Sequence, residues 1–169
     1  MAVLGLRTPN LKLRSIDLPH KNVRDYDVAD TDLLTTAGDA EGPLYDGEFV
    51  YLDTNGQLAR AVAGVADFDG DPLLVVAGAG RIDCMTTGKA SVYWDAPGLE
   101  FETKVKNQTD VFAVGSNLTI GVVAIEGDDK AGFRLAVSGE AVYAVVVETT
   151  ALTGTDFLKV RSMAKHYMP

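Results

Sequence analysis

The segment LEFETKV at residues 99–105 indicates the fold class of this 169-residue chain. Its apolar residues and threonine alternate strictly with charged residues, which is the pattern of a strand with one buried and one wet face. The turn-forming sequence DAPG at 95–98 precedes it. Glu100 and Glu102 share the wet face beside a lysine, so we interpret them as ordinary surface charge rather than a catalytic carboxylate pair.

Short segments of the same kind continue on both sides of this strand. Asn55-Gly56 is the strongest hairpin signal, because both residues accept positive φ. Residues 140–149 are apolar on both faces and should lie in the centre of a sheet or be covered by a partner. Strands are also expected at 47–53, 57–66, 73–77, 81–85, 89–95, 110–114, 119–126, 132–137 and 156–161. About ten short strands separated by turns predict an all-β fold, a single antiparallel barrel or sandwich.

The chain has the length and the apolar content, 47%, of one globular domain. We place the body of the domain at residues 41–162, with a C-terminal tail at 163–169. Residues 1–40 lack sustained periodicity, and Pro9 and Pro19 disfavour helix there. We therefore predict an extended N-terminal arm, with an acidic shoulder, that becomes ordered on a neighbouring protein. A frayed terminus without a role is the alternative.

Charge is distributed unevenly along the chain. The net charge of −9 argues against sequence-independent binding of nucleic acid by the body. Residues 1–24 nevertheless carry five Lys and Arg against one Asp, a net charge of +4. Residues 25–60 carry nine Asp and Glu against one Arg, a net charge of −8. No secretory signal or membrane-spanning apolar run is apparent, so neither secretion nor membrane binding is expected.

Candidate catalytic residues are few and badly placed. His20 lies in the arm, His166 in the expected tail, and the lone Cys84 cannot close an internal disulfide. No nucleophile motif or phosphate-binding loop occurs, and one Cys with two His cannot complete a four-ligand zinc site. We therefore predict a protein that is not an enzyme and needs no cofactor.

One acidic segment, DFDGD at 67–71, begins like a calcium loop. Asp67, Asp69 and Asp71 occupy alternate positions, but Gly78 stands where an EF-hand needs a bidentate glutamate. We interpret the segment as a solvated turn and assign no metal. A weak cation site formed by these three carboxylates at a subunit contact is the alternative.

Two adjacent aromatic residues are candidates for an interface. Tyr93 and Trp94 follow one another in an expected strand and so point to opposite faces. One of them should belong to the core, and the other could anchor a partner. Core packing is the preferred interpretation for Trp94.

The order of several short phrases suggests a family. A short apolar and basic arm leads into DGEFVYL at 46–52 and NGQ at 55–57, followed by an alanine- and valine-rich strand. ASVYWD at 90–95 and a second half rich in glycine and valine come later. Over roughly residues 40–162, this order resembles that of small capsid decoration, or cement, proteins of tailed bacteriophages.

The resemblance implies a structural role on a virus head. Such proteins have bodies of β-tulip or jelly-roll-like form and make trimers at threefold or quasi-threefold positions of the capsid. There they clamp neighbouring major-capsid subunits, while their arms lie along the shell. The implied partners are thus the major capsid protein and other copies of the chain. The implied location is the capsid surface of a virion, and the protein would be made in the host cytoplasm.

We expect the arm to provide the capsid contact, because a segment that orders on a partner can add a strand to an exposed sheet edge. Two other assignments stay open: a tail or baseplate β-domain, and a small β-barrel module that binds a ligand. The candidate contact residues are the basic and apolar residues of the arm: Arg7, Leu11, Lys12, Leu13, Arg14, Ile16 and Leu18.

Overall fold

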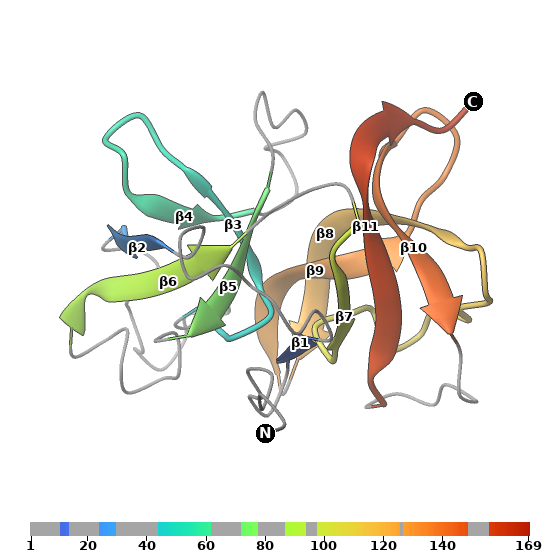
Figure 1. The fold of residues 1–169 in the computed structure, drawn as a ribbon, viewed down its shortest axis with the longest axis horizontal. Helices are drawn as coiled ribbons and strands as arrows, with labels where there is room; N and C mark the ends of the chain where they lie inside the picture. Colours follow the sequence, from blue (N-terminus) through green and yellow to red (C-terminus); the bar gives the residue numbers. More distant parts are fainter. Residues whose placement is uncertain are drawn as a thin grey trace, which may run out of the picture.

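The computed structural model describes residues 11–13, 24–29, 44–61, 72–77, 87–93, 98–125, 127–148 and 156–169. The regular elements in these ranges are eleven β-strands, arranged as two antiparallel sheets that lie side by side (Figure 1). The prediction of an antiparallel all-β fold is therefore confirmed, and the arrangement is that of a β-sandwich.

The larger sheet has six strands and contains most of the C-terminal half of the chain. β10, which was predicted to be central, pairs with β11 on one side and β8 on the other. β8 and β9 form a long hairpin that turns at Gly127, where φ is 91°. The strand order is β1 (Leu11–Leu13), β7 (Glu100–Thr103), β11 (Leu158–Tyr167), β10 (Ala141–Glu148), β8 (Asn117–Ile125) and β9 (Asp128–Leu135).

The smaller sheet has five strands and includes the hairpin predicted from Asn55-Gly56. The carboxylate of Asp53 accepts hydrogen bonds from the backbone N–H groups of Asn55 and Gln57, both 2.8 Å long, and Gly56 takes a φ of 75°. The strand order is β2 (Arg24–Asp27), β6 (Lys89–Tyr93), β5 (Leu73–Ala77), β3 (Phe49–Leu52) and β4 (Leu58–Arg60).

Both sheets curl. In the smaller sheet the two edge strands meet, and in the larger sheet the segment after β7, the second strand, meets the edge strand β9. Val28, directly after β2, forms a parallel bridge with Leu58 of β4. In the larger sheet, Lys106 follows β7 and forms a parallel bridge with Phe133 of β9. Each contact is a single bridge rather than a continuous ladder, so neither sheet is a closed barrel.

The two sheets share one hydrophobic core. Phe49 and Leu74 of the smaller sheet are fully buried in the same cluster as Phe101 and Phe133 of the larger sheet. The rings of Phe49 and Phe133 meet edge to face with centroids 4.8 Å apart, a favourable geometry for aromatic pairs. A second cluster, inside the curl of the smaller sheet, contains Val28, Leu44, Val50, Leu58, Ala90 and Val92.

The predicted ends of the chain differ from the structure. β1 and β2 lie within the predicted arm, yet they pair with β7 and β6 of the chain's own body. A tail starting at residue 163 was also wrong, because β11 continues to Tyr167 and Met168 exchanges backbone hydrogen bonds with the 139–140 turn. These backbone pairings were not visible in the sequence, since neither segment alternates cleanly.

The strand predicted at 110–114 is wrong as well, because this segment is a loop. Side chains bind backbone groups that a ladder would otherwise use: the Asp110 carboxylate accepts from the N–H of Leu135, and the Ser116 hydroxyl accepts from the N–H of Ala113. Asp and Ser side chains commonly compete with sheet formation in this way.

Gly132 allows the closest backbone approach in the larger sheet. A Cβ atom at this position would lie 2.5 Å from the carbonyl oxygen of Val105 and 2.6 Å from Cγ2 of Val123. The backbone at residue 105 is the part of the chain that bridges to β9, so it cannot retreat without breaking that contact. Glycine is therefore required there for space.

We expect Gly132→Ala to destabilise the protein by about 1–3 kcal/mol, the usual cost of overpacking. Its cross-strand partner provides a matched control, since an added Cβ at Gly121 would meet only the Arg134 side chain and no backbone atom. Urea unfolding of both variants is the measurement. Equal midpoints for Gly132→Ala and Gly121→Ala would contradict the steric argument.

Candidate functional site

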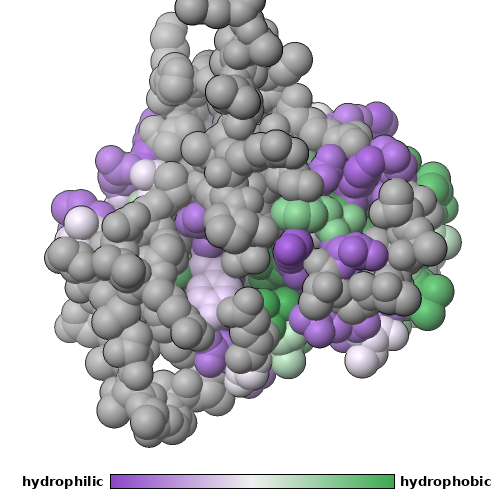
Figure 2. All heavy atoms as spheres, turned by 90° about the horizontal axis from the view of Figure 1, so that it is seen from below, coloured by the Kyte–Doolittle hydropathy of each residue, from purple (hydrophilic) through white to green (hydrophobic). Residues whose placement is uncertain are grey.

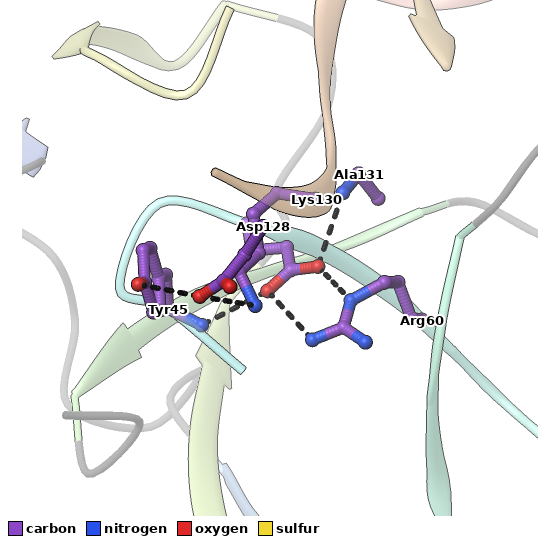
Figure 3. A network of polar contacts seen from close by, with 6 residues as sticks. Tyr45, Arg60, Asp128, Lys130 and Ala131 are labelled. Atoms are coloured by element: carbon purple, nitrogen blue, oxygen red, sulfur yellow. Dashed lines mark hydrogen bonds and ion pairs between the residues drawn. The ribbon is translucent and has the colours of Figure 1, made fainter. Parts of the chain in front are cut away.

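A buried cluster of charged side chains lies where the smaller sheet meets β9 of the larger one (Figure 3). It begins with a tight turn at residues 45–48, in which the N–H of Glu48 donates to the carbonyl of Tyr45 over 3.0 Å. Gly47 has a φ of 89°, a conformation that L side chains rarely adopt. The turn directs the Glu48 side chain inward, where the residue is 0% exposed.

The Glu48 carboxylate binds three different segments of the chain. Its Oε2 accepts from the N–H of Tyr45 over 2.9 Å, and its Oε1 accepts from the N–H of Ala131 in β9 over 3.0 Å. Arg60 at the end of β4 donates from Nε to Oε1 and from Nη2 to Oε2. One side chain thus joins the turn, the smaller sheet and the edge of the larger sheet.

Two further charges complete the cluster. The ammonium group of Lys130, also fully buried, lies 4.3 Å from the centre of the Tyr45 ring and 4.0 Å from Oδ2 of Asp128. The Tyr45 hydroxyl donates to the same Asp128 oxygen over 3.1 Å. Asp128 keeps a side-chain exposure of 20%, so it connects the cluster to solvent. Two carboxylates and two cations make the group neutral as a whole.

Burial has a direct effect on the acid–base properties of this cluster. It raises the pKa of the Glu48 carboxyl above its ordinary value, while Arg60, Lys130 and the N–H of Ala131 act in the opposite direction. Both oxygens of the Glu48 carboxylate are bound by donors of the protein, and this carboxylate does not reach solvent. We therefore interpret the cluster as a structural connection between the sheets rather than as a reaction centre.

The same contact helps to close the outer edge of β9. The N–H groups of Ala131, Phe133 and Leu135 all point away from β8. They donate in turn to the Glu48 carboxylate, the carbonyl of Val105 and the Asp110 carboxylate, over 3.0, 3.0 and 2.8 Å. Edge strands without such partners can pair with other chains. Over these residues, β9 is therefore not open to strand addition.

The opposite end of the larger sheet is different. β1 is its terminal strand, and in the part of the chain that the structure describes no strand pairs with its outer side. β1 lies within the basic arm, and Lys12 stands opposite Glu102 of β7 in the register. Among the described residues, a short strand from the basic segment is therefore the terminal strand at this end of the sheet.

The residues singled out in the sequence are distributed as follows. Leu11, Lys12 and Leu13 form β1, whereas Arg7, Arg14, Ile16 and Leu18 lie outside the described residues. Tyr93 is only 4% exposed and belongs to the main core, so it contributes packing rather than a surface anchor. Trp94, Asp67, Asp69, Asp71, His20 and Cys84 also lie outside the described residues.

The buried charge cluster was not predicted from the sequence. Its members come from residues 45–48, Arg60 and residues 128–131, and no spacing connects these segments. Glu48 lies in the segment 47–53, for which the sequence predicted only a strand. The only signal was a charged residue next to the continuous apolar run FVYL at 49–52.

Among the described residues, no group of three or more His, Cys, Asp and Glu side chains could hold a metal ion. The same residues include no helix that is long and apolar enough to cross a membrane. No family model, curated protein or solved structure matches the chain.

Loss of the Glu48 charge should be costly, because it leaves Arg60 buried without its anionic partner. We expect Glu48→Gln to lower the free energy of unfolding by about 3–5 kcal/mol. Arg60→Met added to Glu48→Gln should recover part of this loss, since the uncompensated cation is then gone. Chemical unfolding of the wild type, both single variants and the double variant measures the coupling.

The exposed pair of Glu100 and Arg161 supplies the control for this cycle. Glu100→Gln should cost no more than about 1 kcal/mol, as is usual for surface ion pairs. Strictly additive effects of Glu48→Gln and Arg60→Met would show that the cluster does not act as a unit.

A second ion pair fastens the connection between β9 and β10. Arg134 donates to both oxygens of Glu140, and the N–H of Val137 donates to Oε2 over 2.9 Å. The hydrogen bond from Arg134 holds the pKa of the Glu140 carboxyl below its ordinary value of 4.5. The stability that this pair contributes is therefore present above that pH and is lost as the pH falls through the folded-state pKa.

We expect Glu140→Gln to reduce the acid sensitivity of the fold. The free energy of unfolding of the variant should decline less steeply below pH 4.5 than that of the wild type. The difference at neutral pH should be at most about 1 kcal/mol, because the pair is partly exposed. Unfolding curves recorded at a series of pH values test this, and parallel pH profiles would contradict it.

Proposed function

We propose that this chain is a non-enzymatic structural protein that binds the outer surface of a tailed-phage capsid and cements neighbouring major-capsid subunits as a homotrimer. The observation that carries the proposal is the basic strand β1 at the terminal position of the six-stranded sheet. The resemblance of the sequence to capsid decoration proteins supplies the kind of partner.

The two edges of the larger sheet support a directional contact. The outward N–H groups of β9 between residues 131 and 135 donate hydrogen bonds to side-chain and backbone groups of the same chain. Strand addition at β1 uses main-chain hydrogen bonds, which give affinity with little dependence on side-chain identity. The protein therefore presents one end of this sheet to a partner and protects the other.

The charge distribution supports the same contact. The first 24 residues have a net charge of +4, although the whole chain has −9. A basic segment on an acidic body favours approach of that segment to an acidic surface and disfavours approach of the body. Many copies on one particle make individually weak contacts cumulative.

A rigid body also suits a cement. The two sheets share one core and are joined by the Glu48 cluster, so a load applied to one sheet is passed to the other. Both oxygens of that buried carboxylate bind donors of the protein, which favours a mechanical role over a catalytic one.

Removal of residues 1–18 should abolish binding to capsids of the encoding virus while leaving a folded body. The deletion removes β1 and the candidate arm residues, and the Glu48 cluster lies elsewhere in the chain. Co-sedimentation of purified protein with capsids that lack it measures the binding, and circular dichroism checks the fold. A truncated protein that binds with unchanged affinity would refute the role of the arm.

Charge reversal at a single residue tests the contact without removing the arm. Lys12→Glu should weaken binding about tenfold, which corresponds to 1.4 kcal/mol, and this effect should shrink at high salt. Lys89→Glu is the matched control, because Lys89 is an exposed strand cation in the other sheet. Wild-type protein that stays in the supernatant at all concentrations would reject the capsid-binding function itself.

A further inference from the structure

The surface of the molecule mixes hydrophilic and hydrophobic residues, as the face drawn in Figure 2 shows. A chemically reactive group lies at the turn between β3 and β4, where Thr54, Asn55 and Gly56 are all exposed. The hairpin that carries this turn projects from the smaller sheet (Figure 1). Only one asparagine of the chain precedes a glycine, and it is Asn55; the others are Asn10, Asn22, Asn107 and Asn117.

An asparagine followed by glycine can lose its amide without an enzyme. The backbone nitrogen of the glycine gives up its proton and attacks Cγ of the asparagine. The bond between Cγ and Nδ2 then breaks, and the amide nitrogen takes up the proton and leaves as ammonia. Water opens the resulting cyclic imide at either carbonyl group. One opening gives aspartate, and the other gives isoaspartate, whose main chain runs through the former side chain.

The turn offers the space and the solvent access that this reaction needs. Glycine favours ring closure because it has no side chain beside the attacking nitrogen. Among the described residues, no atom would lie within 4 Å of a Cβ built on Gly56. Asn55 is exposed, so water and base reach its amide. The surroundings therefore place no steric barrier around the reacting pair.

Asp53 restrains the groups that take part. Its carbonyl accepts from the N–H of Gly56, the attacking nitrogen, over 3.0 Å. Its carboxylate accepts from the N–H of Asn55 over 2.8 Å and from the side-chain amide of Asn55 over 3.4 Å. The N–H of Gln57 donates to the same carboxylate over 2.8 Å and fixes the far side of the turn. The attacking nitrogen and the amide that it must reach are thus each bound to Asp53.

The charge of Asp53 opposes the reaction as well. Hydrogen bonds, above all the one from the N–H of Gln57, hold the pKa of the Asp53 carboxyl below its ordinary value of 3.8. The group is therefore ionised at neutral pH. Loss of the Gly56 proton and attack on the amide both create negative charge next to this carboxylate, and like charges repel one another.

We propose that Asn55 is the site of spontaneous deamidation in this chain, and that Asp53 slows the reaction by holding the β3–β4 turn closed. Deamidation adds a negative charge to a chain that already carries −9. Isoaspartate also lengthens the main chain of the turn, so it strains the hairpin whose second strand supplies Arg60 to the Glu48 carboxylate. No step involves a capsid, so the inference stands apart from the proposed function.

The test is the rate of deamidation at each asparagine of the full-length protein, followed by peptide mapping with mass spectrometry in a mildly alkaline buffer. Deamidation should begin at Asn55. Asp53→Ala should react severalfold faster there than the wild type, and Asp53→Ser, which keeps one acceptor oxygen, should lie between the two. Thr54→Ala is the matched control, because it changes an exposed side chain of the same turn and leaves Asp53 in place, and it should keep the wild-type rate.

Wild-type protein unfolded in urea provides the unprotected rate, which should exceed that of the folded protein. Circular dichroism establishes that the variants fold, and Asp53→Ser alone is compared with the wild type if Asp53→Ala does not. Equal rates at Asn55 in the folded wild type and the folded Asp53 variant overturn the inference. Equal rates in folded and unfolded wild type, or deamidation that begins at another asparagine, overturn it as well.

Discussion

The hydrogen bond from the N–H of Ala131 to the carboxylate of Glu48 is the contact on which the arrangement of the two sheets depends. The carboxylate belongs to the turn before β3, the donor to the edge of β9, and Arg60 of β4 is bound at the same time. A buried ion pair contributes little net stability over a well-packed apolar alternative, but breaking it is costly. Its effect is therefore to select one position of the smaller sheet on the larger one, while the shared core with Phe49 and Phe133 provides most of the stabilisation.

The same contact determines which sheet edge is open. Glu48, Val105 and Asp110 accept hydrogen bonds from the outward N–H groups of β9. The N–H groups of residues 131, 133 and 135 are therefore not available to a partner strand. The other terminal strand of the larger sheet is β1, which is short and lies in the basic part of the chain. Natural sheets commonly protect their edges against aggregation. Here the outer edge of β9 is protected over residues 131–135 by groups of the same chain.

Polar side chains at the loops have two roles in this molecule. Asp110, Ser116 and Glu140 bind backbone N–H groups and so replace strand pairing by fixed loops. They also leave apolar residues exposed on those loops, because the backbone can no longer place them on the buried face of a strand. The failure of the strand expected at 110–114 and the exposure of Val111 and Val114 thus have one origin: local side-chain bonding that competes with the sheet.

The sequence by itself determined the fold class and much of the core. Alternation at 99–105 predicted the buried residues Leu99, Phe101, Thr103 and Val105, and the Asn55-Gly56 signal predicted the β3–β4 hairpin, because both depend on period-two geometry and local turn conformation. Tertiary structure decided the rest. The pairing of β1 and β2 with the body, the extension of β11 and the burial of Glu48, Arg60 and Lys130 all join segments far apart in the chain. Such contacts follow from the curl of the sheets and the shared core, and local sequence patterns carry no information about which distant edge will supply the partner.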